Sequence, residues 1–150
     1  MAEGLNMLLV EPVTLLRRTV SLTARSMGVA RVHEAASTAL AMRLLQAQAF
    51  DGAVIALDED SAPGELHAFA LLDELRGGST ASKAGIPVAV MLDRCDSAML
   101  TALQQRGVTR ILIKPFRARN LLDTFSHFAS AAMLPPQAAT AQPLFGVAPG

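Results

Sequence analysis

Five short apolar runs, each followed by a segment with helical periodicity, constrain the fold of this chain more than any other feature. The runs are continuous stretches rather than alternations of apolar and polar residues, which is typical of parallel strands covered on both faces. They span Leu5–Val10, Ala30–His33, Ala53–Leu57, Ile86–Leu92 and Ile111–Ile113. Because crossovers between parallel strands are right-handed, we expect helices on both sides of one sheet. The sequence therefore predicts an α/β domain of the order βαβαβαβαβα with a five-stranded parallel sheet.

The segments between the runs repeat apolar residues every three to four positions, as amphipathic helices do. The predicted helices are one from Thr14 that Gly28 ends, one capped by Ser37, Glu65–Arg76, one capped by Asp96 or Ser97, and Arg117–Ala131. In the first helix the predicted apolar face consists of Leu15, Leu16, Val20, Ala24 and Met27. The glycines and serines of Gly77–Gly85 predict a flexible loop before the fourth strand.

The periodic pattern stops after Ala131. The remaining residues carry Pro135, Pro136, Pro143 and Pro149 and show no helical or strand period. Such a segment cannot bury enough apolar surface to offset the entropy of ordering it. We therefore expect one domain of residues 1–131 and a disordered tail of residues 132–150.

Charge and cysteine content exclude several classes of protein. The chain has 13 basic and 13 acidic side chains, so no net field draws it to nucleic acid or to an anionic membrane. Cys95 is the only cysteine, which rules out an intrachain disulfide and suits a reducing cytosol. The first residues lack the pattern of a signal peptide, and no apolar run approaches the roughly 20 residues of a membrane span. We expect a cytoplasmic protein that binds neither nucleic acid nor membrane.

The run Ile111-Leu112-Ile113-Lys114-Pro115-Phe116 places a lysine at the end of the last predicted strand. The carboxyl ends of parallel strands form the usual ligand crevice of an open α/β sheet. The Lys–Pro bond is also a candidate for the cis form, because X–Pro bonds lose most of the preference for trans.

With these features, residues 5–130 resemble the CheY-like receiver domain of bacterial response regulators, which has a flavodoxin-like (βα)5 fold. The resemblance implies an aspartate at the end of the third strand that accepts a phosphoryl group, and acidic residues at the end of the first strand that hold Mg²⁺. It also implies a Thr or Ser ending the fourth strand and a Lys ending the fifth.

In this sequence the implied site is largely replaced. Glu11 keeps one acidic position, and Pro12 stands at the second. Ala56 stands at the phosphoacceptor position and Leu92 at the hydroxyl position. The aromatic position of the fifth strand holds Ile111, whereas Lys114 is retained. The resemblance therefore implies a degenerate pseudo-receiver, in which Lys114 either pairs with Glu11 or caps the strand end.

These replacements remove groups that phosphoryl transfer requires. An acyl phosphate forms on a carboxylate nucleophile, and Ala56 has none. Mg²⁺ requires near-octahedral oxygen coordination, for which Glu11 alone is a poor site. We therefore expect no enzymatic activity, no metal and no cofactor. The predicted function is that of a stand-alone module of a two-component or phosphorelay system. It would act by phosphorylation-independent contact with a histidine kinase or relay component, as an adaptor or modulator.

Two alternatives remain open from the sequence. Asp58 lies two residues beyond Ala56, on the same face of an extended strand, and would make the protein an active Mg²⁺-dependent phosphoacceptor. Alternatively, arginines near the fourth and fifth βα units would bind a nucleotide, and the protein would be a sensor.

The same arginines also mark the predicted partner surface. It consists of Arg106, Arg110, Ile111, Arg117 and Arg119. This face, made by the helix after Asp96, the strand Ile111–Ile113 and the helix from Arg117, would also serve a homodimer. Arginine suits such interfaces because its planar fork pairs with carboxylates and phosphates. The first helix, with Arg17, Arg18 and Arg25, is a second candidate surface.

Overall fold

The computed structural model describes residues 5–28, 31–57 and 67–133, and these form one parallel sheet with helices on both faces. The strands are β1 (Asn6–Val10), β2 (Arg31–Ala35), β3 (Gly52–Ala56), β4 (Val88–Leu92) and β5 (Arg110–Ile113). The helices are α1 (Thr14–Ser26), α2 (Thr38–Ala47), α3 (Ala68–Arg76), α4 (Ser97–Gln105) and α5 (Ala118–Met133). The sheet order is β2-β1-β3-β4-β5, with every pair parallel. The predicted fold class is confirmed.

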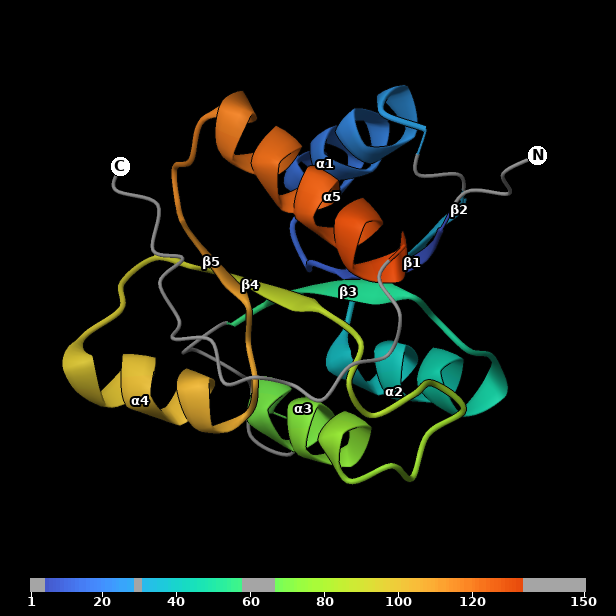
Figure 1. Cartoon of the computed structure of the whole chain (residues 1–150). Helices are drawn as coiled ribbons and strands as arrows, with labels where there is room; N and C mark the ends of the chain where they lie inside the picture. The colour runs from blue at the N-terminus through green and yellow to red at the C-terminus, as the bar shows by residue number, and fades with distance from the viewer. Residues whose placement is uncertain (1–4, 29–30, 58–66, 134–150) are drawn as a thin grey trace.

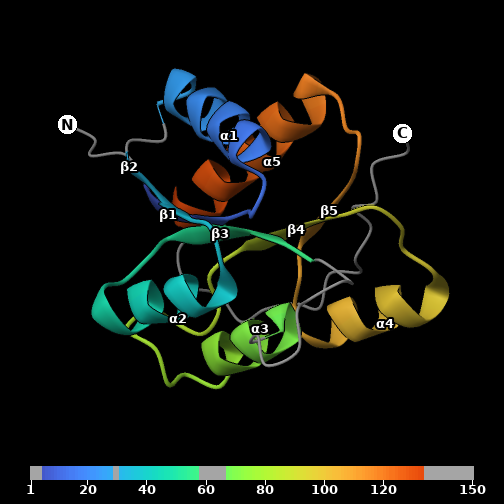
Figure 2. The ribbon, with the colours of Figure 1, turned by 180° about the vertical axis from the view of Figure 1, so that it is seen from behind.

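Two helical layers enclose the sheet. Helices α1 and α5 lie on one face, and α2, α3 and α4 lie on the other (Figures 1 and 2). Alternate strand residues point to opposite faces, so Met7, Leu9 and Val54 pack with Phe125 under α1 and α5. Their neighbours Leu8, Val10, Ala53 and Ile55 pack towards the other layer. This double burial explains the fully apolar strands β3 and β4, whereas the edge strand β2 carries Arg31, His33 and Glu34.

Helices α2, α3 and α4 each begin after a side chain that accepts a hydrogen bond from a backbone N–H of the first turn. The sequence predicted the caps of α2 and α4. Ser37 caps α2 as predicted, because its hydroxyl accepts from the backbone N–H of Leu40. Asp96, the first of two predicted candidates, caps α4 by accepting from Met99. His67 caps α3 through its ring Nδ1, so this helix begins at Ala68. Residues 65 and 66 of the predicted helix lie outside the described residues.

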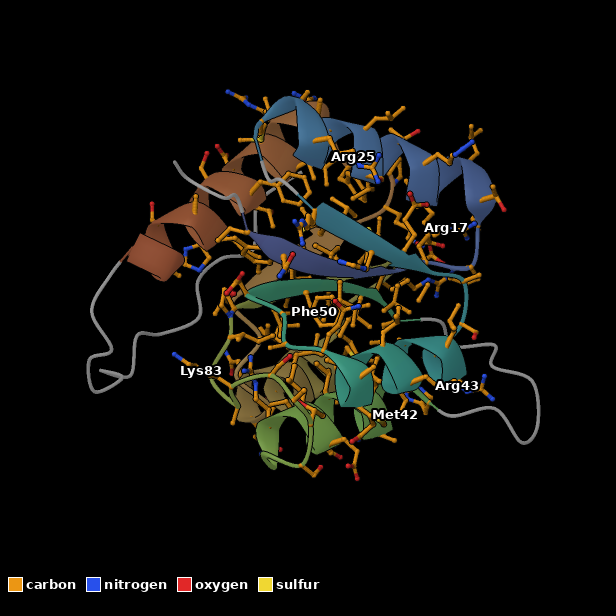
Figure 3. All side chains as sticks on the ribbon, turned by 90° about the vertical axis from the view of Figure 1, so that its right-hand side faces the viewer. Arg17, Arg25, Met42, Arg43, Phe50 and Lys83 are labelled. Carbon is orange, nitrogen blue, oxygen red and sulfur yellow. The ribbon has the colours of Figure 1, made fainter. Side chains whose placement is uncertain are left out.

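The loop before β4 is held in place although its composition predicts flexibility. Ser82 is buried, and its hydroxyl accepts from the backbone N–H of Phe50 at 2.9 Å. The backbone N–H of Ala81 donates to the carbonyl of Leu45 at the end of α2. Phe50 itself lies between the sheet and α2 (Figure 3). The loop is thus anchored to the α2 and β3 side of the domain.

Arg76, at the end of α3, joins three backbone segments. Its guanidinium donates to the carbonyls of Ala84 and Ile86 in the loop before β4. It also donates to the carbonyls of Arg106 at 2.8 Å and Gly107 at 2.9 Å, where α4 ends. Burial lowers the pKa of this guanidinium. Arg76 therefore ties α3 to the C-terminal end of α4.

Among the described residues, no helix combines the length and the apolar character needed to cross a membrane.

We predict that Arg76→Met lowers the free energy of unfolding by about 3 kcal/mol, because three partly buried carbonyls and one exposed carbonyl lose their donor. Urea denaturation followed by far-UV circular dichroism measures this change. Arg43→Met is the matched control, since Arg43 is exposed on α2. Equal stability of the two variants would contradict a structural role for the Arg76 contacts.

Candidate functional site

The carboxyl ends of four neighbouring strands bring the predicted site residues together. Glu11 follows β1, Ala56 ends β3, Leu92 ends β4 and Lys114 follows β5. Val10 pairs with Ile55, so the chain places Glu11 beside Ala56 at this edge. Ala56 in turn pairs with Met91. The structure therefore brings Glu11, Ala56, Leu92 and Lys114 to one edge of the sheet.

Lys114 reaches across the crevice to Glu11. Its Nζ lies 3.0 Å from Oε1 of Glu11, although the two residues are 103 positions apart in the chain. Neighbouring strands are about 4.8 Å apart, so β5 and β1 are separated by roughly 14 Å across β4 and β3. Two long side chains pointing towards each other are needed to cover this distance. Of the two roles predicted for Lys114, the structure shows the ion pair with Glu11.

Both oxygens of the Glu11 carboxylate are in use. Oε1 receives Lys114, and Oε2 accepts from the backbone N–H of Val13 at 3.0 Å. The Glu11 side chain is 1% exposed and the Lys114 side chain 24% exposed. A carboxylate this deeply buried needs a cation and hydrogen-bond donors to remain ionised at low cost. Lys114 and Val13 supply them.

The rest of the crevice floor is apolar. Ala56 is 5% exposed and Leu92 is 3% exposed. Leu57, beside them, continues the sheet by donating its backbone N–H to the carbonyl of Met91 at 2.8 Å. Neither Ala56 nor Leu92 carries a nucleophile or a hydroxyl group. Asp58, the alternative acceptor, lies outside the described residues.

These residues do not fit a magnesium ion. Each Glu11 oxygen already accepts from one donor, Pro12 offers no side-chain ligand and Ala56 offers none either. Mg²⁺ in proteins usually keeps one or two carboxylates in an octahedral shell. Within the part of the chain that the structure describes, no three His, Cys, Asp or Glu side chains are grouped to hold a metal.

The predicted partner residues fall into two groups. Arg106 pairs with Asp73 of α3 at 2.8 Å and stacks over the ring of Phe69 at 4.3 Å. Ile111 is 1% exposed, so its side chain belongs to the core and offers no contact surface. Arg117 and Arg119 are exposed around the start of α5. The sequence could not distinguish these groups, because it does not show that α3 and α4 lie side by side.

Arg110 is half-buried on β5 and affects a histidine of α5. Burial first, and the charge of Arg110 second, lower the pKa of His127. Cys95 is partly buried before α4, and burial, with a smaller contribution from Asp96, raises the pKa of its thiol. A raised pKa reduces the thiolate fraction, and with it the reactivity of the sulfur.

The exposed leucines on the outer face of α1 are a feature that sequence reasoning missed, although it named this helix as a second candidate surface. Leu15 is 78% exposed and Leu22 is 65% exposed, and they lie seven residues apart, on one face of the helix. Val13, just before the helix, is 55% exposed. The prediction that Leu15 belongs to the buried face is wrong, because Val20 and Ala24 pack against the sheet from the opposite side of the helix. Two consecutive leucines fit two different helical faces, so the sequence did not identify the buried one.

We predict that Lys114→Met lowers the free energy of unfolding by roughly 2 kcal/mol, because the buried Glu11 carboxylate loses its cation. In a Glu11→Gln background the same substitution costs much less. Chemical denaturation of the wild type, both single variants and the double variant measures the coupling. Additive effects of the two substitutions would contradict a direct ion pair.

Comparisons with known proteins agree with the architecture. No family model matches the chain, and no curated protein matches it in sequence. Among solved structures, the receiver domain of the Francisella response regulator 1452 has a TM-score of 0.72 and 17% identity, covering 86% of this chain and 99% of that chain. The Vibrio cholerae chemotaxis protein CheY4 has a TM-score of 0.72 and 22% identity, covering 84% and 99%.

A third solved structure is the receiver domain of the Pseudomonas aeruginosa sensor histidine kinase PA1611, which contains a magnesium ion in its active site cleft. It has a TM-score of 0.69 and 21% identity, and the match covers 85% of this chain and 99% of that one. Likeness at this level of identity shows the fold. This chain has the fold of CheY-like receiver domains.

Proposed function

We propose that this protein is a receiver-like signalling module that acts by contact with a protein partner, without accepting a phosphoryl group at the end of β3. The ion pair between Lys114 and Glu11, which crosses the crevice beside Ala56, carries this proposal. Phosphoryl transfer to this edge requires a carboxylate nucleophile and a cation that screens the phosphoryl charge. Ala56 supplies no nucleophile, and the lysine and the acidic residue already neutralise each other.

The partner belongs to a two-component or phosphorelay pathway in this proposal. Support comes from the fold and from the solved neighbours, which include a chemotaxis protein and the receiver domain of a sensor histidine kinase. A histidine kinase or a relay protein is therefore the class of partner that we propose. The module modulates that partner by binding it.

The outer face of α1 is the contact surface that the exposed side chains favour. Leu15 and Leu22 supply apolar anchors, with Arg18 and Arg25 beside them on the exposed side of the helix. Arg17 is not part of this surface, because it pairs with Glu34 at 3.2 Å. Helix α1 contains no acidic residue. A second copy docked through the same helix would bring like charges together.

The charge of this face indicates the chemistry of its occupant. Leu15 and Leu22 lie two helical turns apart and are flanked by arginines. A partner helix that fits this face would be amphipathic and would present leucine-sized side chains beside acidic residues. Arg117 and Arg119 remain exposed around the start of α5 and are the part of the predicted arginine surface that is open to a partner. Dimerisation through α4, β5 and α5 stays a prediction.

Incubation with acetyl phosphate and Mg²⁺, followed by intact-mass spectrometry, tests the proposed absence of phosphoryl transfer. We expect no phosphoryl adduct on the wild-type protein, because Ala56 has no nucleophilic oxygen. Circular dichroism of the same sample confirms that the protein remains folded.

Asp58→Asn is the informative variant in this test. An adduct on the wild type that disappears in Asp58→Asn would overturn the proposal and make Asp58 the phosphoacceptor. An adduct that persists in this variant would also overturn it and would place the nucleophile elsewhere.

A photo-reactive amino acid at position 22 tests the contact surface in cells of the source organism. We expect a covalent adduct with one partner from position 22 and none from position 43, which is exposed on α2 in the other helical layer. Adding Arg18→Glu and Arg25→Glu should reduce the adduct about tenfold, because reversed charges repel an acidic helix. Undiminished cross-linking after charge reversal would exclude an acidic partner on this face.

A further inference from the structure

One network of contacts runs along the carboxyl edge of the sheet from β5 to β2 and includes the start of α1. Lys114 binds the Glu11 carboxylate, and the same carboxylate accepts from the backbone N–H of Val13. Arg17 of α1 donates through Nη1 to the backbone carbonyl of Glu11 at 2.8 Å, and through Nε to Glu34 of β2 at 3.2 Å. This network connects β5, β1, α1 and β2. Its five residues are Lys114, Glu11, Val13, Arg17 and Glu34.

The start of α1 depends on this network because its own cap is weak. Val13 occupies the N-cap position and offers no side-chain acceptor. The first N–H groups of a helix need acceptors from outside the helix, and Ser, Thr, Asp or Asn normally supplies one from the cap itself. Here the acceptor for the Val13 N–H is Glu11, two residues upstream. The carboxylate that Lys114 holds therefore also holds the entry into α1.

The orientation of Glu11 depends in turn on Lys114. The Glu11 side chain is almost fully buried, and within the described part of the chain its two oxygens accept from Lys114 and from the Val13 N–H. Without the ammonium group, the buried carboxylate would lose its compensating charge and would turn towards solvent. This movement would displace the acceptor that faces the Val13 N–H. The exposed Val13 and Leu15 of the contact surface lie directly at this point of the chain.

We propose that Lys114 is a positioning residue for the outer face of α1: acting through Glu11, it sets the first turn of the helix and the placement of Val13 and Leu15. The role of α1 as a docking face rests on the proposed function. The effect of Lys114 on the start of α1 does not depend on that function.

Amide hydrogen exchange, measured residue by residue with NMR, tests this link in the full chain. We expect Lys114→Met to increase the exchange rate of the Val13 amide at least about tenfold, which is a local loss of roughly 1.4 kcal/mol. Amides of the core strand β4 should keep their rates once the difference in global stability is subtracted. Lys83→Met is the matched control, because Lys83 and Lys114 are the two lysines of the chain and Lys83 is exposed on the loop before β4 (Figure 3).

Two further variants separate positioning from general stabilisation. Lys114→Arg retains the cation and should restore slow exchange at Val13. In a Glu11→Gln background, Lys114→Met should produce no additional increase at Val13, because its route to the helix is already interrupted. Unchanged Val13 exchange in Lys114→Met, or an increase at Val13 that the loss of global stability accounts for in full, would overturn the proposal.

The two proposals fail in different experiments. The exchange measurement uses no phosphodonor and no partner, so a negative result would leave the proposed contact function standing. A phosphoryl adduct in the mass experiment would overturn the proposed function and would not alter the exchange result.

Discussion

The ion pair between Glu11 and Lys114 is the interaction on which the carboxyl edge of this domain depends. Burying a carboxylate costs free energy when no cation is near. Lys114, which follows a strand three positions away in the sheet, supplies the compensating charge for Glu11. The ion pair requires that β5 end level with β1 along the strand direction, so that Lys114 can reach Glu11. It also requires that the side chains between the two groups be small or apolar. Ala56 and Leu92 meet the second demand. Ala56 and Leu92, which carry neither a nucleophile nor a hydroxyl group, are therefore compatible with the ion pair beside them.

The layers and the strand order follow from patterns that are local in the sequence. Continuous apolar runs predict strands buried on both faces, and connecting helices allow only a few arrangements of a parallel sheet. The crevice residues were predictable for the same reason, since all of them lie at or directly after strand ends. Glu11, Ala56, Leu92 and Lys114 meet at one edge because parallel strands share their direction. The register of the sheet then determines which of them are neighbours.

What the sequence did not reveal depends on contacts between distant helices. Arg106 carries a charge that suggests a surface role, yet Asp73 and Phe69 of α3 engage it. Arg76 has carbonyl partners in a loop and at the end of α4, and no sequence motif marks carbonyl acceptors. Leu15 and Leu16 differ in burial because only one helical orientation fits the sheet and α5. The apolar side chains of the sequence were enough to predict the core. Which charged and apolar residues lie outside the core depends on how the helices pack against the sheet and each other.

The ion pair also bears on what a second carboxylate at this edge of the sheet would meet. An aspartate introduced at Ala56 would enter a position that is 5% exposed and would have to share one ammonium group with the buried Glu11 carboxylate. Two carboxylates around one cation in a poorly solvated site repel each other, and one of them would be driven to take up a proton. A single Ala56→Asp substitution would therefore weaken the hold of Lys114 on Glu11, unless a second cation entered the site to balance the added charge. The one ammonium group at this edge thus limits how many carboxylates the strand ends can hold.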